Sequence, residues 1–101
     1  TQEIKLVPYV VYCLENLQKR IYPKFIIINS GYRTSEHNEE VNGALQSYHL
    51  KGMAVDCYVQ GFNLTKLAKL GLRYGFSTAI IYSNHVHFDI RKKGLGLRYA
   101  K

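Results

Sequence analysis

Residues 47–56 read SYHLKGMAVD, and this stretch organises the fold around it. We expect a loop over 44–52 and a strand over 53–59. Successive side chains on a strand point to opposite faces, so one face would carry Ala54, Asp56 and Tyr58. The other face would pack inward and consists of Met53, Val55, Cys57 and Val59. Asp56 would then point to a site, with the small Ala54 leaving room beside it and Gly52 allowing the chain to turn.

A second motif follows about thirty residues later, where residues 85–89 read HVHFD. On a strand over 85–91, the same alternation places four polar side chains on one face: His85, His87, Asp89 and Arg91. Strand residues two apart are separated by roughly 6.5–7 Å. One histidine could therefore bind a metal while the other contacts substrate or a water molecule. Two imidazoles and a carboxylate meet the need of a catalytic zinc site for three protein ligands and an open fourth position.

These motifs, with the sequence SGYR at residues 30–33, resemble the M15 peptidases and their wider group. That group includes D-Ala-D-Ala carboxypeptidases and dipeptidases, murein endopeptidases and phage endolysins, and the hedgehog signalling domain is a structural relative. The family pattern S-x-H-x(2)-G-x-A-x-D is matched at every defined position: Ser47, His49, Gly52, Ala54 and Asp56. The resemblance extends from about Phe25 to Arg91, roughly two thirds of the chain.

The resemblance implies a zinc ion bound by His49, Asp56 and His87. It gives Arg33 the family arginine's role of binding the substrate carbonyl or carboxylate. Ser47 is a position of the motif and Tyr48 lies next to it, and we expect both to contact substrate.

The general base is left open by the resemblance. Some members of the group place Glu or Asp three residues before the last zinc histidine, but here that position is Asn84, which cannot take a proton. Other members use a His-x-His pair, which favours His85 as the catalytic base. Asp89 is the alternative, either as base or as a partner that orients a ligating imidazole.

The function implied is a zinc peptidase that hydrolyses bacterial cell-wall stem peptides, with a D-Ala-D-Ala carboxypeptidase as the leading hypothesis. One alternative is an endopeptidase or endolysin that cuts the L-Ala-D-Glu bond or a crosslink. Another is a zinc-bearing binding module on the same fold that does not turn substrate over. For the peptidase the partner would be peptidoglycan, and the place of action the bacterial cell wall or periplasm.

Size and composition agree with one domain over residues 1–101, and we favour a monomer. Apolar residues make up 47% of the chain, and the formal net charge is +7. The basic residues are scattered without a nucleic-acid-binding signature, so we expect no nucleic-acid partner but attraction to an anionic cell wall. The longest apolar run, Leu6 to Leu14, is too short to span a membrane. We find no signal-peptide pattern, and we expect a phage-encoded or trimmed protein. The two cysteines, Cys13 and Cys57, are expected to be buried free thiols.

The expected fold is α+β, a small and mainly antiparallel sheet with helices packed on one side, like the hedgehog and D-Ala-D-Ala peptidase folds. An amphipathic helix is predicted over 3–20, starting only near Pro8 if the proline limits it, with an apolar stripe of Ile4, Val7, Val11, Leu14 and Leu17. A buried strand is predicted over 25–29 and a short helix over 36–42. A second amphipathic helix should begin at Asn63 and end near Gly75. Two strands, 79–82 and 86–90, should be joined by Ser83 and Asn84.

Overall fold

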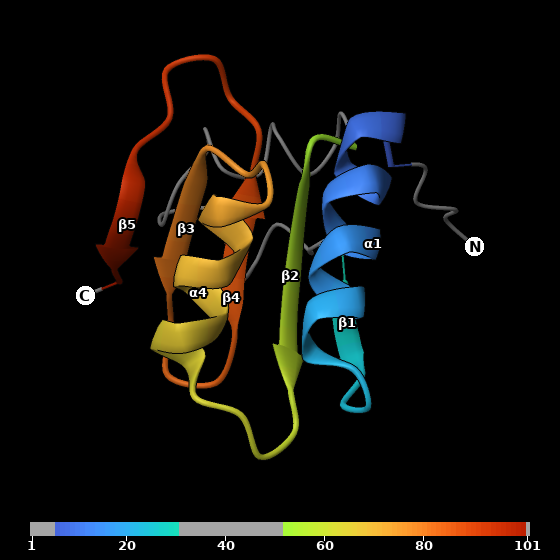
Figure 1. The fold of residues 1–101 in the computed structure, drawn as a ribbon. Helices are drawn as coiled ribbons and strands as arrows, with labels where there is room; N and C mark the ends of the chain where they lie inside the picture. Colours follow the sequence, from blue (N-terminus) through green and yellow to red (C-terminus); the bar gives the residue numbers. More distant parts are fainter. Residues whose placement is uncertain (1–5, 31–51, 101) are drawn as a thin grey trace.

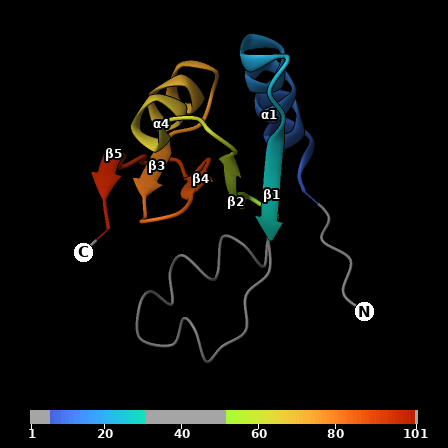
Figure 2. The ribbon, with the colours of Figure 1, turned by 90° about the horizontal axis from the view of Figure 1, so that it is seen from below.

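The computed structural model describes residues 6–30 and 52–100 (Figure 1). In these ranges the order of elements is α1 (Pro8–Ile21), β1 (Ile26–Ser30), β2 (Ala54–Val59), α4 (Leu64–Arg73), β3 (Thr78–Ile81), β4 (Val86–Asp89) and β5 (Gly96–Tyr99). The strands form one sheet in the order β1-β2-β4-β3-β5. Both helices lie on the same side of it (Figure 2). The expected α+β fold is confirmed, and the short helix expected over 36–42 lies outside the described residues.

The sheet is antiparallel except at one margin. β1 pairs with β2, β2 with β4, and β4 with β3, all antiparallel, whereas β5 runs parallel to β3. β5 was not expected from the sequence. Its residues are half-buried or exposed, so it lacks the strong apolar pattern by which a buried strand is recognised.

α1 begins at Pro8, the alternative start that the proline indicated. Pro is well accommodated there, because the first turn of a helix leaves its N–H groups without helical partners. The face that packs on the sheet consists of Val10, Cys13, Leu17 and Ile21. The predicted stripe was wrong at Val11, which is 39% exposed. The period of 3.6 residues allows two neighbouring stripes here, and only packing on the sheet selects between them.

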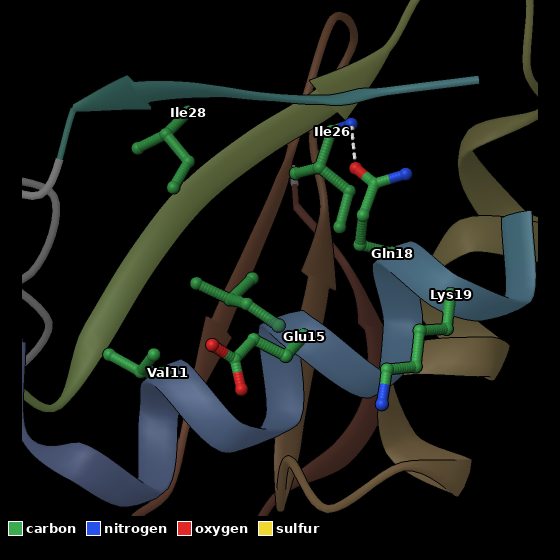
Figure 3. A pocket seen from close by; sticks show the side chains of 7 residues that line it. Val11, Glu15, Gln18, Lys19, Ile26 and Ile28 are labelled. Atoms are coloured by element: carbon green, nitrogen blue, oxygen red, sulfur yellow. Dashed lines mark hydrogen bonds between the residues drawn. The ribbon is translucent and has the colours of Figure 1, made fainter. Parts of the chain in front are cut away.

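β1 was predicted to be buried, and this was wrong. Phe25, Ile27 and Ile28 are all exposed. The strand lies at the end of the sheet, and an open hollow of about 600 Å³ separates it from α1. Figure 3 shows Ile26 and Ile28 above this hollow, with the side chain of Gln18 accepting a hydrogen bond of 2.9 Å from the Ile26 N–H.

The second predicted helix is confirmed as α4. The side chain of Asn63 caps it by accepting a hydrogen bond of 2.8 Å from the backbone N–H of Lys66. α4 packs closely on the sheet at Gly71, where a Cβ atom would overlap the ring of Phe88. Phe88 in turn stacks on Phe76 with ring centroids 4.6 Å apart, so the core lies between the helices and the central strands.

Both cysteines lie in the core. Cys13 and Cys57 are buried and free, as predicted. Burial raises the pKa of the Cys57 thiol to about 12, so the thiolate form needed for metal binding or nucleophilic attack is disfavoured. Neither described helix, in residues 6–30 and 52–100, is long and apolar enough to cross a membrane.

Candidate active site

The pairing of β2 with β4 brings the two sequence motifs together. Asp56 lies directly opposite His87, and Ala54 lies opposite Asp89. Residues two apart on a strand share a face, so His87 and Asp89 project from β4 on the same side as Asp56. The helices cover the other face, where Val55, Cys57 and Phe88 belong to the core. The site is therefore built on two adjacent inner strands of the sheet.

His87 lies between two carboxylates. Its Nδ1 atom is 3.2 Å from Asp56 Oδ1, and its Nε2 atom is 2.7 Å from Asp89 Oδ2. All three side chains are almost fully buried. Burial alone would lower the pKa of His87, but the hydrogen bonds and charges of Asp56 and Asp89 outweigh it and raise the pKa above the ordinary value.

Asp89 is held from a second direction by Arg91. The Arg91 guanidinium donates from Nε to Asp89 Oδ1 at 2.9 Å and from Nη2 to Asp89 Oδ2 at 2.6 Å, and the Arg91 backbone N–H also donates to Oδ1. Burial would raise the pKa of Asp89, but the contacts with His87 and Arg91 prevail and hold it well below the ordinary value. The sequence placed Arg91 on the correct face without assigning it a role. The spacing of two between Asp89 and Arg91 is the signal that could have found this ion pair.

His85 reaches the same site from the turn that precedes β4. Its Nε2 atom lies 3.8 Å from Asp56 Oδ2. Its Nδ1 atom lies 2.7 Å from Asn84 Oδ1, and its ring stacks on Tyr82 with centroids 4.5 Å apart. The ring is largely buried. Asp56 is thus approached by both histidines of the second motif, one through each carboxylate oxygen.

Asp56 and His87 suit two ligands of one zinc ion. Bonds of about 2.0–2.2 Å at a tetrahedral angle place two ligand atoms about 3.4 Å apart. The observed separation of 3.2 Å between Asp56 Oδ1 and His87 Nδ1 is close to that value. Among residues 6–30 and 52–100, no group of three His, Cys, Asp or Glu side chains is arranged to hold a metal ion.

Several residues predicted for the site lie outside the described residues. They are the expected third zinc ligand His49 and the expected substrate-binding residues Arg33, Ser47 and Tyr48. Gly52, which begins the second described range, has φ +73° in the left-handed region that favours glycine. The turn conformation expected before β2 is therefore present at Gly52.

Comparison with known proteins identifies the family of the chain. The family model described as Peptidase M15 matches residues 3–89. The chain belongs to the peptidase M15 family. Peptidases of this family generally depend on zinc.

Similar curated proteins are peptidoglycan L,D-endopeptidases named MepK, from Escherichia coli K12, Escherichia coli O157:H7 and Shigella flexneri. Each is 37% identical to this chain over 67 residues. The matched segment covers 59% of this chain but only 37% of the length of each relative.

Proposed function

We propose that this M15 chain is a zinc-dependent endopeptidase acting on the peptides of peptidoglycan. The observation that carries the proposal is the cross-strand pair of Asp56 and His87 at ligand spacing, with His85 beside the same carboxylate. The endopeptidase activity in the names of the relatives supports internal cleavage over the removal of a terminal D-alanine. A D-Ala-D-Ala carboxypeptidase, the leading hypothesis from sequence, is kept as the alternative that the experiment below distinguishes.

The metal would be held by Asp56 Oδ1 and His87 Nδ1, with His49 as the third ligand implied by the family motif. When bound, zinc would lower the pKa of a water molecule and polarise the scissile carbonyl. The contact of His87 Nε2 with Asp89 supports this arrangement. A proton on Nε2, donated to the Asp89 carboxylate, leaves the Nδ1 lone pair directed toward Asp56, which is the form that a metal ligand requires.

His85 is the better candidate for the general base. Both oxygens of Asp89 already accept hydrogen bonds, and its lowered pKa makes it a poor proton acceptor. His85 has its Nε2 atom at the edge of the site, next to Asp56 Oδ2. We propose that His85 takes a proton from the attacking water and passes it to the leaving nitrogen. Asp89 would orient His87 rather than react.

The substrate contacts rest on the sequence. Arg33 would bind the carbonyl or carboxylate of the substrate, and Ser47 and Tyr48 would line the groove beside it. The net charge of +7 suits an anionic polymer such as the cell wall, where we propose that the protein acts. A zinc-bearing binding module is the remaining alternative. The position of His85 argues against a binding module, because a module that only binds has no need of a base beside the proposed metal ligands.

The test is incubation of the zinc-loaded protein with purified peptidoglycan, followed by mass spectrometry of the soluble products. An endopeptidase releases fragments cut inside the stem peptide or its crosslink, whereas a carboxypeptidase releases free D-alanine. Asp56→Asn serves as the inactive control, and Ser83→Ala, at an exposed position outside the site, as the active one. Absence of any product from a fully zinc-loaded wild-type protein would support the binding module and refute the proposal.

A further inference from the structure

The turn between β3 and β4 holds His85 by three separate contacts, one to its backbone and two to its ring. The backbone N–H of Tyr82 donates to the carbonyl of His85 at 2.9 Å, which closes the turn around Ser83 and Asn84. The Asn84 side-chain oxygen lies 2.7 Å from His85 Nδ1. The Tyr82 ring stacks on the imidazole with an interplanar angle of 6°. The first contact fixes the base of the side chain, the second its rotation in the plane, and the third the plane itself.

The Asn84 contact also decides which nitrogen carries the proton in the neutral ring. An amide oxygen can only accept a hydrogen bond, so His85 Nδ1 must donate and therefore carry the hydrogen. Nε2 is then left with its lone pair, and this atom is the one 3.8 Å from Asp56 Oδ2. Free neutral histidine favours the opposite tautomer, with the hydrogen on Nε2. The turn thus selects the form that can accept a proton at the site.

We propose that Asn84 is a positioning residue that holds His85 in the Nδ1–H tautomer, with Tyr82 fixing the ring plane. Its consequence for turnover rests on the proposed function, but the tautomer itself does not. The arrangement also explains why position 84 can carry an amide, whereas some members of the M15 group have Glu or Asp at the corresponding position. The amide takes no proton and instead prepares the neighbouring imidazole to take one.

The tautomer can be measured directly by nitrogen NMR of the imidazole rings in ¹⁵N-labelled protein, with and without zinc, at a pH where the rings are neutral. A His85→Gln spectrum assigns the His85 signals among those of the four histidines. We expect the hydrogen of His85 on Nδ1 in the wild type and in Asn84→Asp, which keeps an oxygen acceptor. In Asn84→Ala we expect a shift toward the Nε2–H form. Ser83→Ala, which alters an exposed neighbour in the same turn, should match the wild type.

A wild-type spectrum with the hydrogen on Nε2 would overturn the proposal, because the amide would then be donating to Nδ1. An Asn84→Ala spectrum identical to that of the wild type would overturn it as well. If Asn84→Ala fails to fold, as circular dichroism would show, the wild-type and Asn84→Asp spectra still decide the matter.

Measurement of turnover gives a second and independent test of the role of Asn84. Asn84→Ala should keep its zinc and its KM but lose on the order of tenfold in kcat, less than the 10²–10⁴ expected for removing a general base itself. A wild type with the Nδ1–H tautomer and no turnover would refute the proposed function and leave the positioning role intact. A wild type that cleaves peptidoglycan while carrying the hydrogen on Nε2 would refute the positioning role alone.

Discussion

The two histidines of the HVHFD motif lie two residues apart but occupy opposite kinds of environment. His87 belongs to a central strand and is enclosed by the carboxylates of Asp56 and Asp89. His85 belongs to a turn and is held by the neutral amide of Asn84 and the ring of Tyr82. Carboxylates on both sides favour a cation, whether a proton or a metal ion. A neutral amide on one side leaves the far nitrogen able to take and release a proton. The difference therefore suits His87 to the proposed metal and His85 to the proposed role of base.

The largest effect should come from His87→Ala. Removing a ligand leaves Asp56 and His49 too few to hold zinc tightly, so we expect loss of bound metal and of more than about 10³ in turnover. Elemental analysis after dialysis, together with the peptidoglycan assay, measures both losses. Full zinc occupancy in this variant would show that His87 is not a ligand. It would also refute the proposed division of roles between His87 and His85.

His85→Ala should keep the zinc and the fold but lose on the order of 10²–10⁴ in kcat, the usual range for a general acid–base residue. Zinc content and melting temperature, measured on the same sample, establish that only turnover has changed. Loss of zinc would mean that the two histidines have exchanged roles. Near-normal cleavage would assign the base to another group.

Asp89→Asn should have a smaller effect than either histidine variant. The amide keeps an oxygen acceptor but loses the charge that strengthens the contacts with His87 and Arg91. Residues that hydrogen-bond to metal ligands typically contribute about 10–100-fold to metal affinity, and we expect a loss of zinc affinity in that range. A competition titration with a zinc chelator measures it. A drop in turnover as large as that of His85→Ala, at full zinc occupancy, would instead identify Asp89 as the base.

The smallest effect is a difference in the pH dependence of stability between zinc-free and zinc-loaded protein. The pKa of His87 is raised above 6.5 in the fold, so protonated His87 stabilises the zinc-free protein below that pH, and the stabilisation is lost as pH rises through the raised pKa. Zinc needs the neutral ring, so zinc-dependent stabilisation grows over the same window. Melting temperatures from pH 6 to 9 should therefore diverge by several degrees, zinc-loaded above zinc-free.

His87→Gln is the control for this measurement, because it removes the titrating ring. Its zinc-free melting curve should lose the His87 contribution to the pH dependence. Parallel curves for the zinc-free and zinc-loaded wild type would show that His87 does not couple the metal to the fold.

Local patterns in the sequence determined much of this molecule. Alternation along a strand is a property of the backbone, so it correctly grouped Val55 with Cys57 in the core and Asp56 on the opposite face. Capping depends on one side chain and the next turn, so Asn63 marked the start of α4. The ordered motifs were enough to identify the M15 family, as the family match confirms.

The tertiary structure alone decided what depends on distant partners. The register that sets Asp56 opposite His87 joins residues thirty-one apart, and no local pattern specifies it. The exposure of Ile28 and of Val11 follows from where β1 and α1 meet the sheet, and β5 is a strand only because β3 lies beside it. The same holds for the surroundings of the two histidines. The family resemblance already predicted His87 as a ligand and His85 as the base, but only the folded chain places the carboxylates of Asp56 and Asp89 around His87 and the ring of Tyr82 against His85.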